Sequence, residues 1–248
     1  MLTTTDLTMS FSGGTPAVKD VSLTVERGQI AAVIGPNGAG KTTFLNMMSG
    51  MLTPTAGTVT KDGRDLTSVP AHRRCRLGMG RTFQQPSYFP ELSVLENVQV
   101  PLLASDGTWR RLLGSARRSR RDDALAVLDL VGMADEAGTR AGSLPYGDQR
   151  RLEVAIALGT EPDLLLLDEP MAGMSARERR TLTELLVRLN ADRGLTIAFT
   201  EHDMDVVFAL SHVVHVLYQG ELFASGTPEQ IQADGEVQRI YLGTEEHA

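Results

Sequence analysis

Short apolar segments alternate with glycine-rich turns along the first third of the chain, and each segment predicts one element. Residues 21–25 are apolar at every second position, which is typical of a half-buried strand. Residues 30–34 are apolar throughout, which indicates a strand buried on both faces. After a glycine-rich turn, a helix is expected from about Lys41 to Ser49, where Gly50 ends it.

The middle of the chain, roughly residues 85–150, has the period of helices. Ser93 and Glu96 have the spacing of a capping box at the start of a helix. A second helix is indicated by one packed apolar face, and Gly132 stands where this helix should end. The face comprises Ala124, Val127, Leu128 and Val131. We therefore expect a helical insertion here.

The last hundred residues return to short apolar runs. Residues 164–167 and 195–200 each predict a strand, and a helix with one apolar face lies between them. That face comprises Leu182, Leu185, Leu186 and Leu189. Because the order strand, helix, strand predicts a parallel sheet, the chain is expected to be an α/β protein with a helical insertion.

Composition and charge exclude several classes of protein. The 248 residues are 42% hydrophobic and 22% charged with a net charge of −7, so neither disorder nor a basic surface for nucleic acid is indicated. The single cysteine, Cys75, fits a reducing compartment. The apolar runs are far shorter than the ~20 residues that span a membrane, and the first residues lack a signal-peptide pattern. We expect a cytoplasmic chain that reaches a membrane only through a partner.

A complete phosphate-binding motif, G-x-x-x-x-G-K-[ST], joins the strand at 30–34 to the helix at 41–49. It consists of Gly35, Pro36, Asn37, Gly38, Ala39, Gly40, Lys41 and Thr42. Glycines let successive backbone N–H groups face a phosphate, and the helix start adds partial positive charge. Lys41 is placed to reach the β- and γ-phosphates, and Thr42 to offer its hydroxyl to Mg²⁺. The motif predicts a nucleotide site.

Polar residues follow the two later strands, at the ends where α/β sheets bind ligands. Asp168 and Glu169 come directly after the leucines at 164–167. Downstream of a phosphate loop, Asp168 is suited to hold Mg²⁺, and Glu169 to orient or deprotonate the water that attacks the γ-phosphorus. His202 follows the strand at 195–200 and is placed to reach the γ-phosphate. We interpret the remaining histidines as structural: His72, His212, His215 and His247.

A pair of glutamines, Gln84 and Gln85, lies where the core meets the helical insertion. A side-chain amide at this place can contact Mg²⁺ or the attacking water and report the state of the nucleotide to the insertion. The other interpretation is an exposed turn glutamine. Spacing alone does not choose between the two residues.

With these residues in view, the chain resembles the ATP-binding subunits of ATP-binding cassette (ABC) transporters over essentially its whole length. The resemblance implies a Walker A motif at 35–42, a Q-loop at Gln84 rather than Gln85, and a Walker B motif at 164–168. It assigns catalysis to Glu169, His202, Gln84 and Lys41, and Mg²⁺ ligation to Thr42, Gln84 and Asp168. It assigns ATP binding to the Walker A residues together with Phe11, Thr43, Tyr146, Gly147 and Asp148.

The resemblance also implies the fold, a RecA-like phosphate-loop ATPase core with a mainly parallel sheet, an N-terminal antiparallel β part and an inserted helical subdomain. The chain would be one domain, 1–248, with a catalytic core of residues 1–84 and 151–248. Residues 85–150 would form the helical subdomain with the signature. Two cassettes, identical or paralogous, would enclose two ATP molecules between the Walker A of one and the signature of the other.

The signature region, residues 144–151, departs from the usual Leu-Ser-Gly-Gly-Gln. Pro145 replaces the serine whose hydroxyl contacts the γ-phosphate, and Tyr146 replaces the first glycine. Gly147 and a helix start remain, so backbone N–H groups and the helix dipole can still bind phosphate. One hydroxyl donor fewer would weaken this site for the partner's nucleotide.

Two further positions have two interpretations each. Ser175 stands where the family's D-loop usually has aspartate, and with Glu178 it also has the spacing of a capping box. Phe11 matches the aromatic residue that stacks on adenine, a contact that can contribute about 1–3 kcal/mol by analogy with base stacking. An ordinary core position is the other interpretation of Phe11.

Three segments are similar to branched-chain amino acid importers, at residues 81–84, 146–153 and 240–243, and residues 169–174 are also similar to urea importers. The implied function is hydrolysis of ATP that drives import of branched-chain amino acids or a related small polar solute. The implied partners are transmembrane permease subunits, a second cassette and, indirectly, an extracytoplasmic solute-binding protein, with no nucleic acid. The implied location is the cytoplasmic face of the inner or plasma membrane.

Two other functions stay open. A soluble ABC ATPase of translation or DNA repair usually has a second cassette or a long coiled coil, and this chain has one phosphate loop and no sustained heptads. A phosphate-loop kinase would need an acceptor pocket, and the signature-like segment and His202 count against it.

A cluster of six arginines is either a solvated helix face or a contact with anionic lipid or a transmembrane partner. These are Arg110, Arg111, Arg117, Arg118, Arg120 and Arg121.

Overall fold

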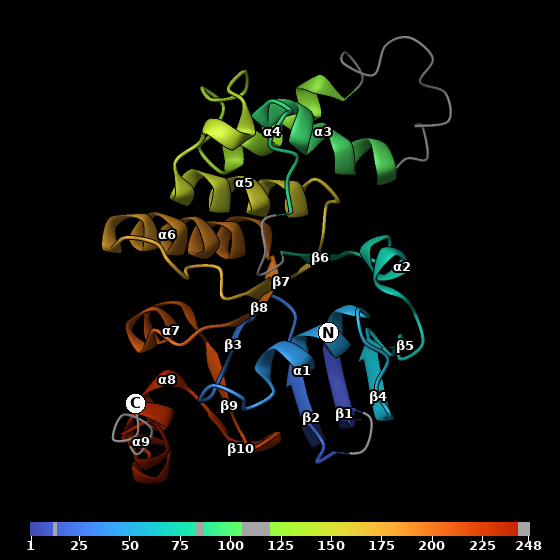
Figure 1. Cartoon of the computed structure of the whole chain (residues 1–248), viewed down its shortest axis with the longest axis vertical. Helices are drawn as coiled ribbons and strands as arrows, with labels where there is room; N and C mark the ends of the chain where they lie inside the picture. Colours follow the sequence, from blue (N-terminus) through green and yellow to red (C-terminus); the bar gives the residue numbers. More distant parts are fainter. Residues whose placement is uncertain (12–13, 83–86, 106–119, 243–248) are drawn as a thin grey trace.

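The computed structural model of the chain describes residues 1–11, 14–82, 87–105 and 120–242, and its strands form two sheets (Figure 1). The first sheet has the order β2-β1-β4-β5 and is antiparallel throughout. Its strands are β1 (Leu2–Met9), β2 (Val18–Val25), β4 (Ala56–Lys61) and β5 (Arg64–Asp65). This sheet confirms the expected antiparallel part and the strand predicted at 21–25.

The second sheet has the order β10-β9-β3-β8-β7-β6. Its strands are β3 (Ile30–Ile34), β6 (Met79–Arg81), β7 (Leu164–Asp168), β8 (Thr196–Thr200), β9 (Val213–Tyr218) and β10 (Glu221–Gly226). Parallel pairing joins β9, β3, β8, β7 and β6, while β10 runs antiparallel to β9. Every residue of β3, β7 and β8 is buried, which confirms the burial on both faces predicted for 30–34 and the strands predicted at 164–167 and 195–200.

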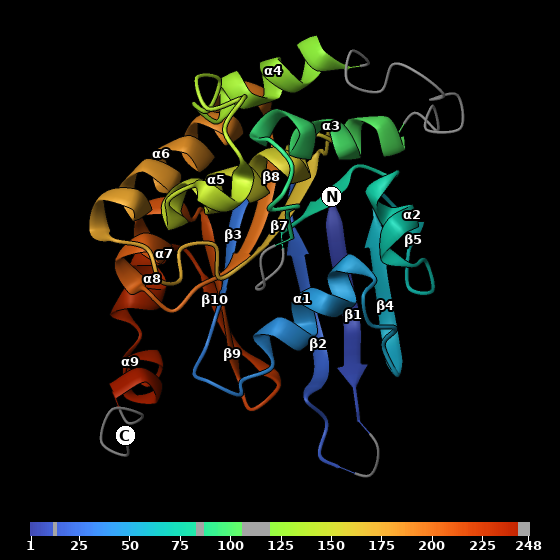
Figure 2. The same cartoon turned by 45° about the horizontal axis from the view of Figure 1, so that its top comes forward.

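Helix α1 (Lys41–Ser49) lies between the two sheets (Figure 2). Its apolar side chains share one hydrophobic cluster with residues of β1, β2 and β4 and with one face of β3, β7 and β8. Gly50 ends the helix at φ 77°, a left-handed conformation that glycine adopts without steric cost. The helix has the bounds that the sequence predicts.

Helices cover the other face of the second sheet. They include α5 (Tyr146–Leu158), α6 (Ala176–Arg193), α7 (Met204–Leu210), α8 (Pro228–Ala233) and α9 (Gly235–Leu242). Beyond α5, at the top of Figure 1, lie α3 (Val94–Ser105), α4 (Arg121–Leu130) and a short 3₁₀ turn (Ala141–Ser143). The apolar face predicted for 124–131 packs into the hydrophobic core that these helices share with the second sheet, which confirms the predicted face. The expected junction at residues 150–151 falls inside α5.

Both capping boxes that the sequence indicates are formed. The Ser93 hydroxyl accepts the Glu96 N–H at 3.1 Å, and the Glu96 carboxylate accepts the Ser93 N–H at 2.9 Å. Ser175 and Glu178 make the same reciprocal pair at the start of α6. The capping interpretation of Ser175 is therefore confirmed, and its role as a D-loop residue stays a prediction.

None of the helices within the described ranges is both long and apolar enough to cross a bilayer. Of the six clustered arginines, Arg120 and Arg121 are described, and Arg120 forms an ion pair with Asp123 at 2.9 Å. The other four lie outside the described residues.

Arg74, in the short helix α2 (Ala71–Cys75), is a buried cation that the sequence does not single out. Its guanidinium donates to five backbone carbonyls, those of Met47, Met48, Leu66, Thr67 and Val69. Burial lowers the pKa of Arg74 to about 10, so it stays protonated at neutral pH. Arg74 thus caps the end of α1 and fixes the loop that returns from β5.

Arg74→Lys is expected to lower the free energy of unfolding by about 2–4 kcal/mol, because an ammonium group cannot reach carbonyls on both sides of the guanidinium. Urea titration followed by circular dichroism measures the change. The matched control is Arg73→Lys on the exposed side of the same helix, expected within about 0.5 kcal/mol of wild type. Equal losses in the two variants would contradict the assignment.

His215 on β9 is 4% exposed, and its Nδ1 lies 2.8 Å from the Ser225 hydroxyl. Its Nε2 is buried and has no hydrogen-bond partner within the described part of the chain. Burial lowers the pKa of His215 from 6.5 to about 4, because the charged imidazolium would lose its hydration. The structural interpretation of this histidine agrees with its placement.

The stability that neutral His215 contributes is complete above pH 6.5 and is lost as the pH falls toward 4, because the unfolded chain binds the proton first. Between pH 7 and pH 4.5, wild type should lose about 2–3 kcal/mol more unfolding free energy than His215→Gln. Urea titrations at the two pH values measure this. The control His72→Gln, at an exposed position, should lose as much unfolding free energy between the two pH values as wild type does.

Candidate nucleotide-binding and catalytic site

The predicted functional segments meet because four parallel strands are neighbours. The order β3-β8-β7-β6 places the phosphate loop, the segment with His202, the pair Asp168–Glu169 and the segment leading to Gln84 along one edge of the sheet. In parallel strands these carboxyl ends lie on the same side, which is where α/β sheets bind ligands.

The phosphate loop has a backbone path that glycine alone allows at its two key positions. Gly40 has φ 97°, and a Cβ there would lie 2.4 Å from the Ala17 carbonyl oxygen. A Cβ on Gly35 would lie 2.2 Å from the Leu217 carbonyl oxygen. The loop encloses a cavity of about 240 Å³, which is lined by Ala17, Asn37, Gly38, Ala39, Gly40, Lys41, Thr42, Thr43 and Glu169.

Lys41 is turned into the loop and is 7% exposed. Its ammonium donates to the carbonyl oxygens of Gly35 at 2.7 Å and Pro36 at 3.1 Å. Burial lowers the pKa of Lys41, while the negative charges of Glu169 and Asp168 oppose that change. The site thus holds one cation close to two carboxylates.

The Thr200 hydroxyl connects the two carboxylate residues of the site. It donates to Asp168 Oδ1 at 2.8 Å and accepts the backbone N–H of Glu169 at 3.0 Å. Asp168 Oδ2 lies 3.6 Å from Arg81, whose guanidinium also donates to Ser49 and Asn46 of α1. Glu169 has φ 46°, an unusual conformation for a residue with a side chain, and these bonds hold it in place.

His202 does not line the phosphate cavity. Its side chain is 63% exposed, with Nδ1 3.6 Å from the buried carboxylate of Glu201. Glu201 accepts the backbone N–H groups of His202 and Met171, both at 3.0 Å, and so joins the segments after β8 and β7. His202 lies just beyond the carboxyl end of β8, on the same side of the sheet as the phosphate loop. Contact between His202 and phosphate stays a prediction.

Three more predicted residues remain to be placed. Gln84 and its neighbour Gln85 lie outside the described residues. Phe11 is 53% exposed, so its interpretation as a core residue is wrong, and stacking on adenine stays a prediction.

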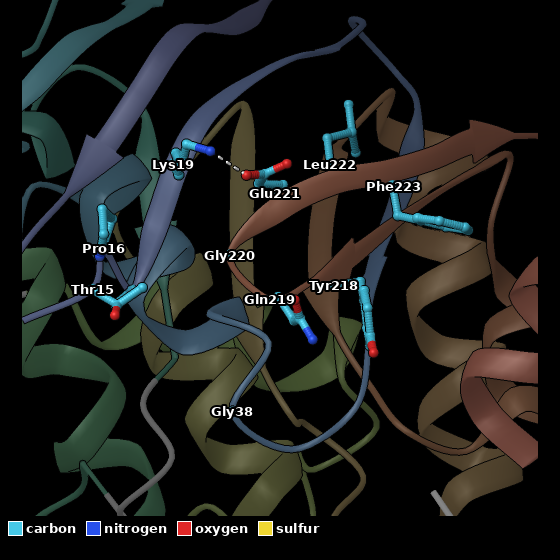
Figure 3. A pocket seen from close by; sticks show the side chains of 11 residues that line it. Thr15, Pro16, Lys19, Gly38, Tyr218, Gln219, Gly220, Glu221, Leu222 and Phe223 are labelled. Carbon is cyan, nitrogen blue, oxygen red and sulfur yellow. Dashed lines mark hydrogen bonds and ion pairs between the residues drawn. The ribbon is translucent and has the colours of Figure 1, made fainter. Parts of the chain in front are cut away.

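A larger cavity of about 630 Å³ adjoins the phosphate loop (Figure 3). Ala17 and Gly38 line both cavities, while the turn between β9 and β10 forms the far wall. Lys19 and Glu221 make an exposed ion pair of 2.6 Å at its edge, so this opening is polar near β2.

The signature residues Tyr146, Gly147 and Asp148 form the start of α5, away from the phosphate cavity of their own chain. The Gly147 N–H donates to Glu178 Oε1 at 3.2 Å, and the Asp148 N–H donates to the Pro145 carbonyl at 3.0 Å. Two amides expected to face a phosphate are therefore occupied within the chain. Their binding of phosphate stays a prediction.

Sequence reasoning missed Thr200, Glu201 and Arg81 as parts of the site. Each lies at or next to the carboxyl end of a parallel strand beside a catalytic segment. This position at a strand end is the sequence signal that could have identified them. What spacing could not show is the register, in which Thr200 is directly opposite Asp168.

Two family models match the sequence. The model described as "ABC transporter" matches residues 18–172. The model described as "Branched-chain amino acid ATP-binding cassette transporter" matches residues 221–247, which include the end of the second sheet and helices α8 and α9.

The chain is similar over its length to the high-affinity branched-chain amino acid transport ATP-binding protein LivG of Salmonella typhimurium, with 40% identity over 250 residues and 98% of each chain covered. An ABC-transporter ATP-binding cassette solved in its ADP conformation matches with TM-score 0.88 and 27% identity over 98% of each chain. A dimeric cassette in a post-hydrolysis state with ADP and Pi matches with TM-score 0.79 and 27% identity, over 92% of this chain and 99% of that one.

Thr200→Val is expected to lower the rate of ATP hydrolysis about tenfold, because Asp168 loses a donor and the Glu169 N–H keeps only its second acceptor, the Thr200 carbonyl at 3.2 Å. Thr200→Ser keeps the hydroxyl and should recover most of the rate. Phosphate release measures both variants, and Thr58→Val at an exposed position of β4 is the matched control. A serine variant as slow as the valine variant would show that the hydroxyl is not the cause.

Proposed function

Because the chain belongs to the ABC transporter family of ATP-binding cassettes, we propose that it is the ATP-hydrolysing subunit of an importer, with branched-chain amino acids or a related small polar solute as cargo. The observation that carries the proposal is the cavity in which Glu169 faces the backbone and lysine of the phosphate loop. An anion bound by the loop would lie between a cation and a carboxylate, the groups that hydrolysis of a phosphoanhydride needs.

The chemistry assigns one task to each side chain. Glu169 orients a water and accepts its proton while the water oxygen attacks the γ-phosphorus and the bond to the β-phosphate breaks. Lys41 leaves the carbonyls of Gly35 and Pro36 to stabilise charge on the phosphate oxygens. His202 and Gln84 are proposed to contact the γ-phosphate and the water from the neighbouring segments.

Asp168 and Thr42 fit a magnesium ion. Asp168 has one carboxylate oxygen held by Thr200, and Thr42 is exposed at the start of α1 beside the cavity. Hard oxygen donors of this kind suit Mg²⁺, which usually also binds oxygens of the nucleotide. When bound, the ion would neutralise charge on the phosphates.

Two cassettes are proposed to close around two nucleotides, with the signature helix α5 of one facing the phosphate loop of the other. The start of α5 supplies partial positive charge for this contact. In this chain Glu178 already accepts the Gly147 N–H, so a phosphate from the second subunit would compete with that carboxylate.

Cargo and partners are proposed from the relatives. The similarity to LivG extends over 98% of the chain, and the branched-chain family model matches the C-terminal residues 221–247 separately from the ATPase core. We propose that membrane-spanning permease subunits bind the chain at the cytoplasmic face of the membrane and that an extracytoplasmic binding protein delivers the solute to them. The helical part beside residues 83–86 is the proposed site of permease contact.

Glu169→Gln is expected to lower the rate of Mg²⁺-dependent phosphate release at least about a hundredfold, because the amide cannot accept the proton of water. Affinity for ATP should be retained, since the phosphate loop is intact. Phosphate release against protein concentration measures turnover, and titration with a fluorescent ATP analogue measures binding. A rate of phosphate release that rises more steeply than linearly with protein concentration would support the proposed dimer.

Glu184→Gln, which removes an exposed carboxylate of α6, should leave both quantities unchanged. Unchanged turnover in Glu169→Gln would remove this residue from the mechanism. Hydrolysis that RNA or DNA stimulates would favour a soluble ATPase of translation or repair, and transfer of the γ-phosphate to an acceptor other than water would favour a kinase.

A further inference from the structure

The hydroxyl of Tyr146 has all three of its hydrogen-bonding positions occupied. It accepts two bonds from Arg150, from Nε at 3.1 Å and from Nη2 at 2.7 Å, and it donates to the Ala172 carbonyl at 3.0 Å. A phenolic hydroxyl has one donor and two acceptor positions, so its orientation is fixed. The bond to Ala172 crosses from the signature helix to the segment that follows Glu169.

The segment after Glu169 is a tight turn that transmits this contact to the glutamate. The Ala172 N–H donates to the Glu169 carbonyl at 3.2 Å, and the Ala172 carbonyl accepts the Tyr146 hydroxyl, so the single residue Ala172 links Tyr146 to the backbone of Glu169. The Tyr146 ring also covers Gly173, where a Cβ would lie 3.3 Å from ring atom Cε1. Because Glu169 has a positive φ, its position depends on bonds to its neighbours.

Arg150 is itself held from the opposite side. Its Nη1 donates to Glu153 at 2.9 Å, and the two side chains are only 9% and 3% exposed. The other carboxylate oxygen of Glu153 accepts the Ser87 N–H at 3.1 Å, just beyond the segment that contains Gln84. A continuous set of polar contacts therefore runs from Ser87 through Glu153, Arg150 and Tyr146 to Ala172.

We propose that Tyr146 is a positioning residue for Glu169: its hydroxyl, oriented by Arg150, holds the turn at residues 169–174 so that the carboxylate faces the phosphate cavity. The effect of Tyr146 is exerted within one subunit, in addition to any role that the signature has toward a second one. The kinetic part of this proposal rests on the proposed ATP hydrolysis, whereas the structural part does not.

Tyr146→Phe removes the hydroxyl and keeps the ring. It should lower kcat for ATP hydrolysis about tenfold and leave KM and the affinity for ATP within about twofold of wild type, because only the reacting carboxylate is displaced. The matched control is Thr160→Val, which also removes a hydroxyl that donates to a backbone carbonyl, that of Ala157 at 3.0 Å, and should leave kcat unchanged. A purely structural role would change thermal stability without separating kcat from KM.

Hydrogen–deuterium exchange tests the structural part without any turnover. In Tyr146→Phe the amides at 171–174 should exchange about fivefold faster, the order that one lost hydrogen bond contributes, while those of β3 should not change. Arg150→Lys should give the same pattern, and it should add little to the change in the Tyr146→Phe background because the two residues act through one bond.

The outcomes separate the two proposals. Unchanged exchange at 171–174 in Tyr146→Phe overturns the positioning role, whatever the enzyme kinetics. Faster exchange with unchanged kcat shows that the turn does not place Glu169 for reaction, which also overturns it. Absence of hydrolysis in wild type contradicts the proposed function alone, and the exchange result then decides whether Tyr146 holds the turn.

Discussion

The site depends on the register of three neighbouring parallel strands, β3, β8 and β7. Thr200 on β8 lies opposite Val33 on β3 in one direction and opposite Asp168 on β7 in the other. This register brings the start of the phosphate loop, the Thr200 hydroxyl and the carboxylate of Asp168 to the same height. A shift of one residue in either pairing would turn Thr200 to the other face of the sheet and separate Asp168 and Glu169 from their shared partner. The buried apolar residues on both faces of these strands therefore fix the chemistry as well as the fold.

Much of this arrangement could be predicted because it is local in sequence. The apolar run at 30–34, the phosphate loop and the helix start that follows it are adjacent, and each constrains the next. The capping boxes are equally local, since Ser175 and Glu178 are three residues apart. For these elements, local preference and tertiary packing agree, which is typical of sequences that specify one fold.

The remainder could not be predicted because it depends on contacts between distant segments. Arg74 binds carbonyls of α1, and nothing in its own sequence neighbourhood indicates that it is buried. The orientation of His202 and the exposure of Phe11 depend in the same way on what packs beside them. The position of Thr200 was visible as a strand end, but its partners follow from strand register, which spacing does not encode.

The carboxylate of Glu178 caps α6 and also accepts an N–H at the start of α5, so one internal anion serves the positive ends of two helices. If a phosphate arrives at α5 in a closed dimer, it replaces a negative charge that is already there. The free energy gained by closure would then be the difference between the binding of phosphate and the binding of the Glu178 carboxylate at the same helix end. In such a dimer the exchange would make the closed state easier to leave after hydrolysis, because the Glu178 carboxylate can take the place of the departing phosphate.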